Sequence, residues 1–307
     1  MRKLHYHLLD VFTNRPFGGN QLAVYTNGRG LSTALMQAIA KEMNFSETTF
    51  VLPPDDPAND YRVRIFTPAS ELPIAGHPTV GTSYVLARER MIGHAGEEAN
   101  IVLEEGVGPV AVRIELKDGE PVFAEMRQPL PTFGRRFEDP APLAEMLSLD
   151  ARDIAETGLV PEVVSCGQPF LYVPVRDLSA IRRIRLRLDV WDRLLGGSDA
   201  SNVFVFTREV EHAGSTVHSR MFAPGIGIGE DAATGAASGP LGCYLVRHQV
   251  FPTDGDARFT SEQGIEMGRP SFIKIRIEHD GRDIRAVRVG GECVFMGEGF
   301  LEVMPDE

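Results

Sequence analysis

The sequence predicts an α+β protein built from two similar halves, each a many-stranded, mostly antiparallel unit with one main helix, facing each other across a cleft. The first observation is an internal repeat. Glu47 and Gly76 are 29 residues apart, and Asn202 and Asp231 have the same separation. The second is that β-branched and aromatic runs of strand length, divided by Gly and Pro, occur in both halves. The third is the length of 307 residues, which exceeds the usual size of one domain.

The N-terminal half shows strand and helix signals in a clear order. Strands are expected at residues 5–12, 22–25, 44–51, 61–67, 100–103, 110–116 and 122–126. Ser32 is the expected N-cap of a helix that reaches Met43 with an apolar stripe at helical spacing. A second helix is expected over 83–90, after a turn in which Pro78 suits a first helical turn.

The C-terminal half repeats these landmarks. Residues 64–68 (RIFTP) are echoed by 220–224 (RMFAP), and 119–123 (GEPVF) by 291–295 (GECVF). The Pro-rich segment 128–142 is interpreted as the join, so that the second half begins near residue 130. The repeat therefore covers most of the chain.

Composition excludes several classes of protein. A hydrophobic content of 43% and a charged content of 24% describe an ordinary globular protein, and a net charge of -12 disfavours nucleic acid and anionic membranes as partners. The cluster Arg182, Arg183, Arg185 and Arg187 is interpreted as a solvated surface. The first ten residues lack the apolar core of a signal peptide, and no run is long enough to span a membrane. We therefore expect a cytoplasmic protein.

Two sets of residues with metal-binding or redox chemistry are present without a convincing pattern. Cys166, Cys243 and Cys293 are widely spaced and form no CxxC pair, so neither a disulfide framework nor a zinc site is predicted, and they are expected to be core thiols. His5 and His7 lie on one face of the first strand, a spacing that suits a metal, but no third ligand is evident nearby. No metal site is predicted.

The turn at residues 229–239 (GEDAATGAASG) places an acidic pair before small residues that permit close backbone approach. Such a turn suits a helix start that binds a carboxylate or phosphate through its unpaired N–H groups. The alternative is a small-residue helix packed tightly on a neighbour, with Glu230 and Asp231 as ordinary acids of its first turn. The matching turn in the first half, with His77 at its edge, favours the first interpretation.

Two such helix starts converging on one cleft would form an anion clamp, with acid or base groups approaching the substrate from opposite sides. This arrangement suits the movement of a proton at carbon. A carboxyl group enclosed beside another carboxylate has a raised pKa and can donate as well as accept a proton.

The motifs together resemble the PhzF family of phenazine-biosynthesis isomerases, within the diaminopimelate epimerase fold superfamily. The resemblance covers the whole chain. The motifs that carry it are residues 10–12 (DVF), 19–20 (GN), 44–48 (NFSET), 75–79 (AGHPT), 229–235 (GEDAATG) and 268–271 (GRPS). They are specific for the family and not for a substrate.

The resemblance implies two barrel-like halves, each wrapped around a central helix, with the last strand returning to the first half. The expected domains are residues 1–128 with 290–307, and 129–289. Members of the family are usually homodimers without cofactors, so a homodimer acting on a small carboxylate without a cofactor is expected here.

The resemblance also implies roles for single residues. Glu47 matches the glutamate that moves a proton between carbons of a dienyl carboxylate, while His77 and Asp231 match residues that hold the substrate and tune that acid. The remaining residues expected to bind substrate are Asn20, Ser46, Gly76, Thr79, Glu230, Thr234, Gly235 and Ala236.

Some residues depart from the family pattern. Diaminopimelate epimerases and proline racemases have cysteine at the positions of Gly76 and Asp231, so a two-thiol racemase is not expected. Ala232 and Ala236 replace a proline and a substrate-binding serine, which bears on the substrate. Pro240 falls inside the second expected helix, where it should kink that helix or delay its regular part.

Three functions are consistent with these residues. The first is a cofactor-independent isomerase, the second a carboxylate-binding protein that has lost catalysis, and the third a racemase, epimerase or dehydratase on the same fold. A simple carboxylate binder gains nothing from two acids beside its anion site. The presence of Glu47, His77 and Asp231 together therefore favours the isomerase.

Overall fold

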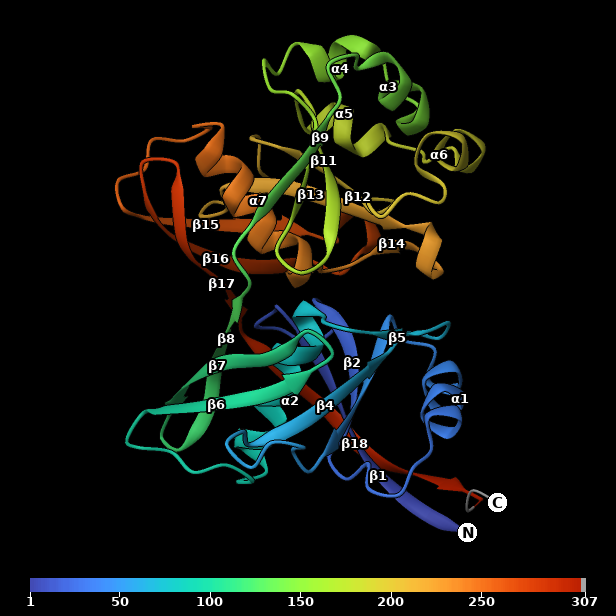
Figure 1. The fold of residues 1–307 in the computed structure, drawn as a ribbon, viewed down its shortest axis with the longest axis vertical. Helices are drawn as coiled ribbons and strands as arrows, with labels where there is room; N and C mark the ends of the chain where they lie inside the picture. The colour runs from blue at the N-terminus through green and yellow to red at the C-terminus, as the bar shows by residue number, and fades with distance from the viewer. Residues whose placement is uncertain (305–307) are drawn as a thin grey trace. The chain divides into compact units, whose positions relative to one another are not determined.

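The computed structural model describes residues 1–304, which form two compact units (Figure 1). The N-terminal unit consists of Met1–Arg127 and the chain from Gly290 onward, and the C-terminal unit of Gln128–Val289. These limits lie within one residue of the domain limits expected from the sequence.

The N-terminal unit is a mostly antiparallel sheet around one helix. Its strands are β1 (Arg2–Val11), β2 (Asn20–Tyr25), β3 (Glu47–Leu52), β4 (Tyr61–Phe66), β5 (Glu71–Leu72), β6 (Glu98–Glu105), β7 (Gly108–Lys117), β8 (Glu120–Gln128) and β18 (Cys293–Val303), and its helices are α1 (Thr33–Met43) and α2 (Gly76–Arg88). The hydrogen-bonded order is β18-β1-β2-β3-β4-β6-β7-β8, in which only β2–β3 and β4–β6 are parallel. Ser32 caps α1 as predicted.

The C-terminal unit has the same strand order with additional short helices. Its strands are β9 (Thr132–Arg136), β10 (Glu162–Ser165), β11 (Pro169–Pro174), β12 (Val203–Thr207), β13 (Val217–Ala223), β14 (Ile228–Asp231), β15 (Asp256–Gln263), β16 (Ser271–Asp280) and β17 (Asp283–Gly291). Its helices are α3 (Ala141–Leu147), α4 (Ala151–Ala155), α5 (Leu178–Arg183), α6 (Leu188–Leu195) and α7 (Gly235–Arg247), with 3-10 turns η1 (Pro224–Ile226) and η2 (Ile265–Met267).

The strand pairing confirms the internal repeat. In the C-terminal unit the order is β9-β10-β11-β12-β13-β15-β16, again with two parallel pairs, β11–β12 and β13–β15. The short strands β5 and β14 occupy the same place in each unit, beside β4 and β13. The fold class is therefore the one the sequence predicts.

One buried helix lies at the centre of each sheet. Helix α2 packs against β1, β2, β3, β6 and β7, and α7 against β10, β11, β15 and β16. Their small residues serve this packing, because a Cβ atom at Gly81 would come within 2.5 Å of Leu22, and one at Gly242 within 2.6 Å of Ile275. Close packing of these helices against their sheets therefore explains part of their content of small residues.

The two central helices begin at different points of the repeat. Helix α2 begins at Gly76, so Pro78 lies in its first turn as predicted, where its missing N–H is tolerated. The repeat pairs Gly76 with Asp231, yet α7 begins at Gly235, four residues after Asp231. Asp231 is the last residue of β14, and Thr234 is the N-cap of α7. Pro240 lies inside α7.

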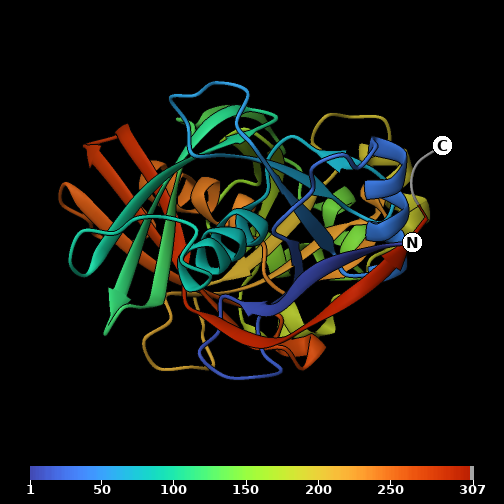
Figure 2. The same cartoon turned by 90° about the horizontal axis from the view of Figure 1, so that it is seen from below.

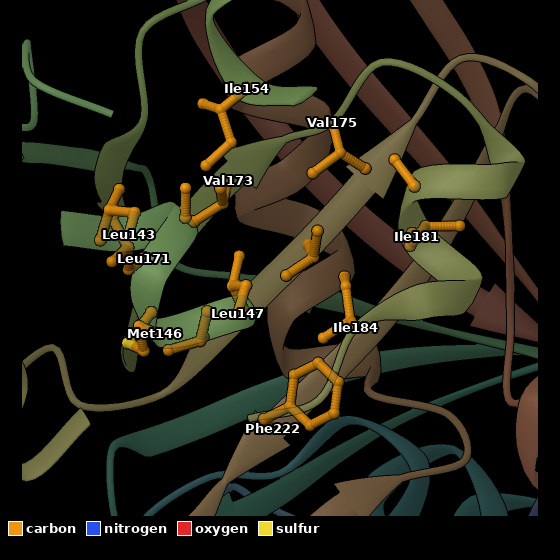
Figure 3. Packing of buried hydrophobic residues seen from close by; sticks show 14 of the residues in the cluster. Leu143, Met146, Leu147, Ile154, Leu171, Val173, Val175, Ile181, Ile184 and Phe222 are labelled. Carbon is orange, nitrogen blue, oxygen red and sulfur yellow. The ribbon is translucent and has the colours of Figure 1, made fainter. Parts of the chain in front are cut away.

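The short helices α3 to α6 cover one face of the C-terminal unit and were not predicted. They bury a hydrophobic cluster that includes Leu147, Ile154 and Ile181 against β11, β12 and Phe222 of β13 (Figure 3). Three arginines of the Arg cluster are paired with acids, since Arg182 contacts Glu211, Arg183 contacts Asp153 and Arg187 contacts Asp189. Arg185 instead donates to the Ile184 carbonyl.

Two of the three cysteines are neighbours in space. Cys166 and Cys243 are buried free thiols whose Sγ atoms are 3.9 Å apart, and Cys293 is a free thiol in the N-terminal unit. Their wide sequence separation gave no sign of this pairing. Within residues 1–304, no helix is both long enough and apolar enough to cross a lipid bilayer.

Candidate active site

Glu47 is the first residue of β3, at the point where this strand joins the parallel pair with β2. Its register places it opposite Leu22, and the residue is 7% exposed. A carboxyl group is seldom this buried in a protein without a functional or ionic reason. The sheet thus carries Glu47 into the interior beside the start of α2.

His77 is the second residue of α2 and approaches Glu47 closely. Its Nε2 atom is 3.2 Å from Glu47 Oε2. The residue is 2% exposed, and burial lowers the pKa of His77 to about 3, so the imidazole is uncharged near neutral pH. Among the described residues the Nε2 atom has no aligned hydrogen-bond partner, although it lies beside the carboxyl group.

Asn20 and Ser46 hold the far side of this imidazole. The Ser46 hydroxyl donates to Asn20 Oδ1 at 3.2 Å, and the Asn20 amide lies 3.2 Å from His77 Nδ1. With the Asn20 oxygen engaged by Ser46, its NH₂ group donates to Nδ1. The imidazole proton is then on Nε2, on the side of Glu47. Four residues predicted for the site are therefore brought together.

The start of α2 has no side-chain cap. Ala75 is its N-cap and makes no side-chain capping hydrogen bond. Helix α7, whose N-cap is Thr234, likewise shows no side-chain cap in the described part of the chain. Uncapped N–H groups at a buried helix start are suited to an anionic ligand.

Asp231 ends β14 in the C-terminal unit, directly before a loop that is held by several hydrogen bonds. Its carboxylate accepts a 2.6 Å hydrogen bond from the Thr234 hydroxyl, and the residue is 4% exposed. Gln263 fixes the same loop, since its amide donates to the Asp231 carbonyl at 2.8 Å and to Thr234 Oγ1 at 3.0 Å. Its oxygen accepts from the Thr234 N–H at 3.1 Å. The sequence gave no signal for Gln263.

Glu230 has an ionic partner of its own. Its two carboxylate oxygens accept from Arg220 at 2.7 and 2.8 Å, and Arg220 also donates to the Ile181 carbonyl at 2.9 Å. Such bidentate pairing engages both carboxylate oxygens with a single guanidinium group. The prediction that Glu230 binds substrate is not carried forward, because the geometry assigns it to Arg220.

Comparison with known proteins decides the family. The family model for phenazine biosynthesis-like proteins matches residues 9–299. The chain belongs to this family. A trans-2,3-dihydro-3-hydroxyanthranilate isomerase of Pseudomonas aeruginosa is 37% identical over 298 residues, covering 96% of this chain and 98% of its own. An uncharacterised isomerase of Mesorhizobium japonicum is 39% identical over 305 residues, covering 98% and 99%.

Solved structures agree with the fold. The crystal structure of a Bacillus anthracis phenazine biosynthesis protein of the PhzF family matches with a TM-score of 0.86 at 27% identity, over 99% of this chain and 100% of that one. Since full-length relatives are named isomerases, this member of the family is an isomerase. The interpretation as a binding protein without catalysis is set aside.

The Thr79 hydroxyl of this isomerase has two partners within the N-terminal unit. Its Oγ1 atom is 2.6 Å from the Ala75 carbonyl and 2.5 Å from Glu105 Oε1. One hydroxyl proton cannot serve both, and a carbonyl cannot donate, so Glu105 supplies the second proton as a neutral acid. Burial raises the pKa of Glu105 to about 8, which agrees with this assignment. The Thr79 hydroxyl is thus committed to the first turn of α2.

Glu105 makes the stability of the protein depend on pH. The folded protein keeps the Glu105 proton up to about pH 8, whereas the unfolded chain loses it at its ordinary value of 4.5. Between these values the folded state binds more protons, so this carboxyl lowers the free energy of unfolding as pH rises.

Glu105→Gln retains a donor for Thr79 and cannot ionise. We expect it to be more stable than wild type by a few kcal/mol at pH 8 and by much less at pH 5. Thermal unfolding at both pH values measures this, with Glu104→Gln as a neighbouring control. An equal effect at both pH values contradicts a neutral Glu105.

A cavity of about 690 Å³ in the N-terminal unit is not lined by Glu47 or His77. Arg62, Arg64, Glu71, Glu104 and Glu105 are among its lining residues. In the described part of the chain, its lining includes none of the residues predicted to act on or bind substrate. The candidate active site is therefore defined by the contacts of Glu47 and not by this cavity.

Proposed function

We propose that this isomerase moves a proton between two carbons of a small carboxylate without a cofactor, with Glu47 as the proton carrier. Glu47 removes a proton from one carbon as the double bond shifts, and returns it to another carbon. The product therefore has the same composition and oxidation state as the substrate. Such general acid–base catalysis needs one group that both accepts and donates.

The observation that supports this proposal is the contact between Glu47 and His77. A buried carboxyl lies 3.2 Å from an imidazole whose Nε2 has no aligned hydrogen-bond partner among residues 1–304. A polar atom buried in this way costs free energy unless a ligand or water meets it. Two adjacent polar groups held by a rigid strand and a rigid helix suit a substrate that approaches both.

His77 is proposed as a hydrogen-bond donor and not as the general acid. An imidazole with a pKa of about 3 carries no additional proton near neutral pH, so it can orient a substrate or Glu47 but has no proton to give up readily. Asn20 and Ser46 keep its donor side directed toward Glu47. The uncapped start of α2 is proposed to bind the substrate carboxylate.

Asp231 is proposed as a second substrate-binding group, held in one orientation by Thr234 and Gln263. Gly235 and Ala236 begin α7 beside it, and Ala236 has no hydroxyl to offer. Relatives named trans-2,3-dihydro-3-hydroxyanthranilate isomerase suggest a dienyl carboxylate. Ala236 favours a substrate with less need for a hydrogen bond at that position.

The test is a screen of purified protein with small carboxylates that carry a weakly acidic allylic C–H, including trans-2,3-dihydro-3-hydroxyanthranilate. Proton NMR follows the position of the double bond, in buffer with a chelator and without added nucleotide. We expect isomerisation of at least one dienyl carboxylate under these conditions. A requirement for a nucleotide or an added metal contradicts the proposal.

A further inference from the structure

Strand β18 supplies the ligand that His5 and His7 lacked in the sequence. It pairs antiparallel with β1, with Glu298 directly opposite His7 and Phe300 opposite His5. Figure 2 shows these first and last strands side by side. The three side chains share one face of the sheet, although nearly three hundred residues of sequence separate them.

The distances in this cluster suit a metal ion. His5 Nε2 is 3.3 Å from Glu298 Oε2, and His7 Nδ1 is 3.8 Å from the same oxygen. One ligand atom from each residue lies within 4.8 Å of the others. Bonds of about 2.1 Å in a tetrahedral site hold neighbouring ligand atoms about 3.4 Å apart.

The His7 imidazole is the second, independent indication. The residue is 1% exposed, and its Nδ1 atom is buried with no hydrogen-bond partner among the described residues. Glu89 Oε1 is 3.7 Å away, and Glu298 Oε2 3.8 Å, both too long for a hydrogen bond. A buried nitrogen directed at two carboxylates that it does not bond is well explained by an ion between them.

A simple ion pair does not account for the unsatisfied Nδ1 atom of His7. His5 and Glu298 are partly exposed and form an ordinary surface pair, but this pair leaves Nδ1 of His7 unsatisfied. A second His and Glu cluster, in the C-terminal unit, shows the contrast. Both nitrogens of His218 there are hydrogen-bonded at 2.9 Å, to Glu262 and Glu266. The imidazole of that cluster therefore has no nitrogen left for a metal ion.

We propose that His5, His7 and Glu298 bind a divalent transition-metal ion of the zinc type, with the fourth coordination position open to water. Two imidazoles and carboxylate oxygen are a ligand set that zinc accepts. The ion would tie β1 to β18. Its role is structural, and it is independent of the proposed isomerisation.

The probes are zinc(II) and cobalt(II), added to the full chain after removal of metal with a chelator. We expect calorimetry to give one zinc per chain, cobalt to give the visible absorption bands of a low-coordinate site, and zinc to raise the melting temperature. Both His5→Ala and Glu298→Gln are expected to weaken zinc binding at least about tenfold. Glu302→Gln is the matched control, because it removes a carboxylate from the same strand outside the cluster.

Melting temperatures without metal verify that the two partly exposed variants fold. Wild-type protein that binds no stoichiometric zinc contradicts the proposal. So does zinc binding that is equally strong in wild type, His5→Ala and Glu298→Gln, since the ion then binds elsewhere. Neither result bears on isomerisation, which is assayed in the presence of chelator.

Discussion

Glu47→Gln is expected to lower kcat about a hundred- to ten-thousand-fold while the protein keeps its fold, because the amide retains the size of the side chain but cannot carry a proton between carbons. The loss should appear in kcat with little change in KM, since His77 and the start of α2 remain to bind the substrate.

Steady-state kinetics of wild type and Glu47→Gln measure this effect, with melting temperature as the control for folding. Glu42→Gln is the matched variant, because Glu42 is an exposed acid of α1 with no place in the proposed site. A Glu47→Gln enzyme that retains a normal kcat removes Glu47 from the mechanism and makes Asp231 the next residue to test.

Glu230→Gln is expected to destabilise the protein by about 3 kcal/mol without changing kcat. Arg220 is 6% exposed, and its guanidinium would remain buried without its bidentate partner. Removal of one member of a buried ion pair is costly because the other charge stays desolvated. Thermal or urea unfolding measures the loss, and kinetics below the melting transition measure kcat.

The double variant Arg220→Met, Glu230→Gln distinguishes ion pairing from substrate binding. Replacement of a buried pair by groups without charge is often nearly neutral, so most of the lost stability should return. If Glu230→Gln instead keeps the wild-type melting temperature and raises KM, then Glu230 contacts substrate as the family resemblance first suggested.

The sequence predicted the architecture well because local residue patterns specify most of the strands and turns. The equal spacing from Glu47 to Gly76 and from Asn202 to Asp231 corresponds to two sheets with the same strand order. Each strand carries its own alternation of residues, and each Gly or Pro cluster marks a turn. The approach of Glu47 to His77 followed from motifs that lie at strand and helix starts.

The remaining features depend on pairings that no local pattern specifies. Gln263 and Glu105 act through contacts with residues 26 or more positions away, and Glu298 reaches His7 only because β18 pairs with β1. The later start of α7 also escaped prediction. Three residues separate Asp231 from the first residue of α7, in a loop whose shape depends on the buried Gln263.

The role of Glu47 as proton carrier is tested most directly by following the path of the transferred proton. Once a turnover substrate is known, wild type and Glu47→Gln are run in deuterated water, and NMR or mass spectrometry locates deuterium in the product. With wild type we expect deuterium at the carbon that receives the proton, wherever Glu47 exchanges with solvent before it returns that proton. With Glu47→Gln we expect the loss of both rate and label. Near-normal rate and labelling by the variant would contradict Glu47 as the proton carrier.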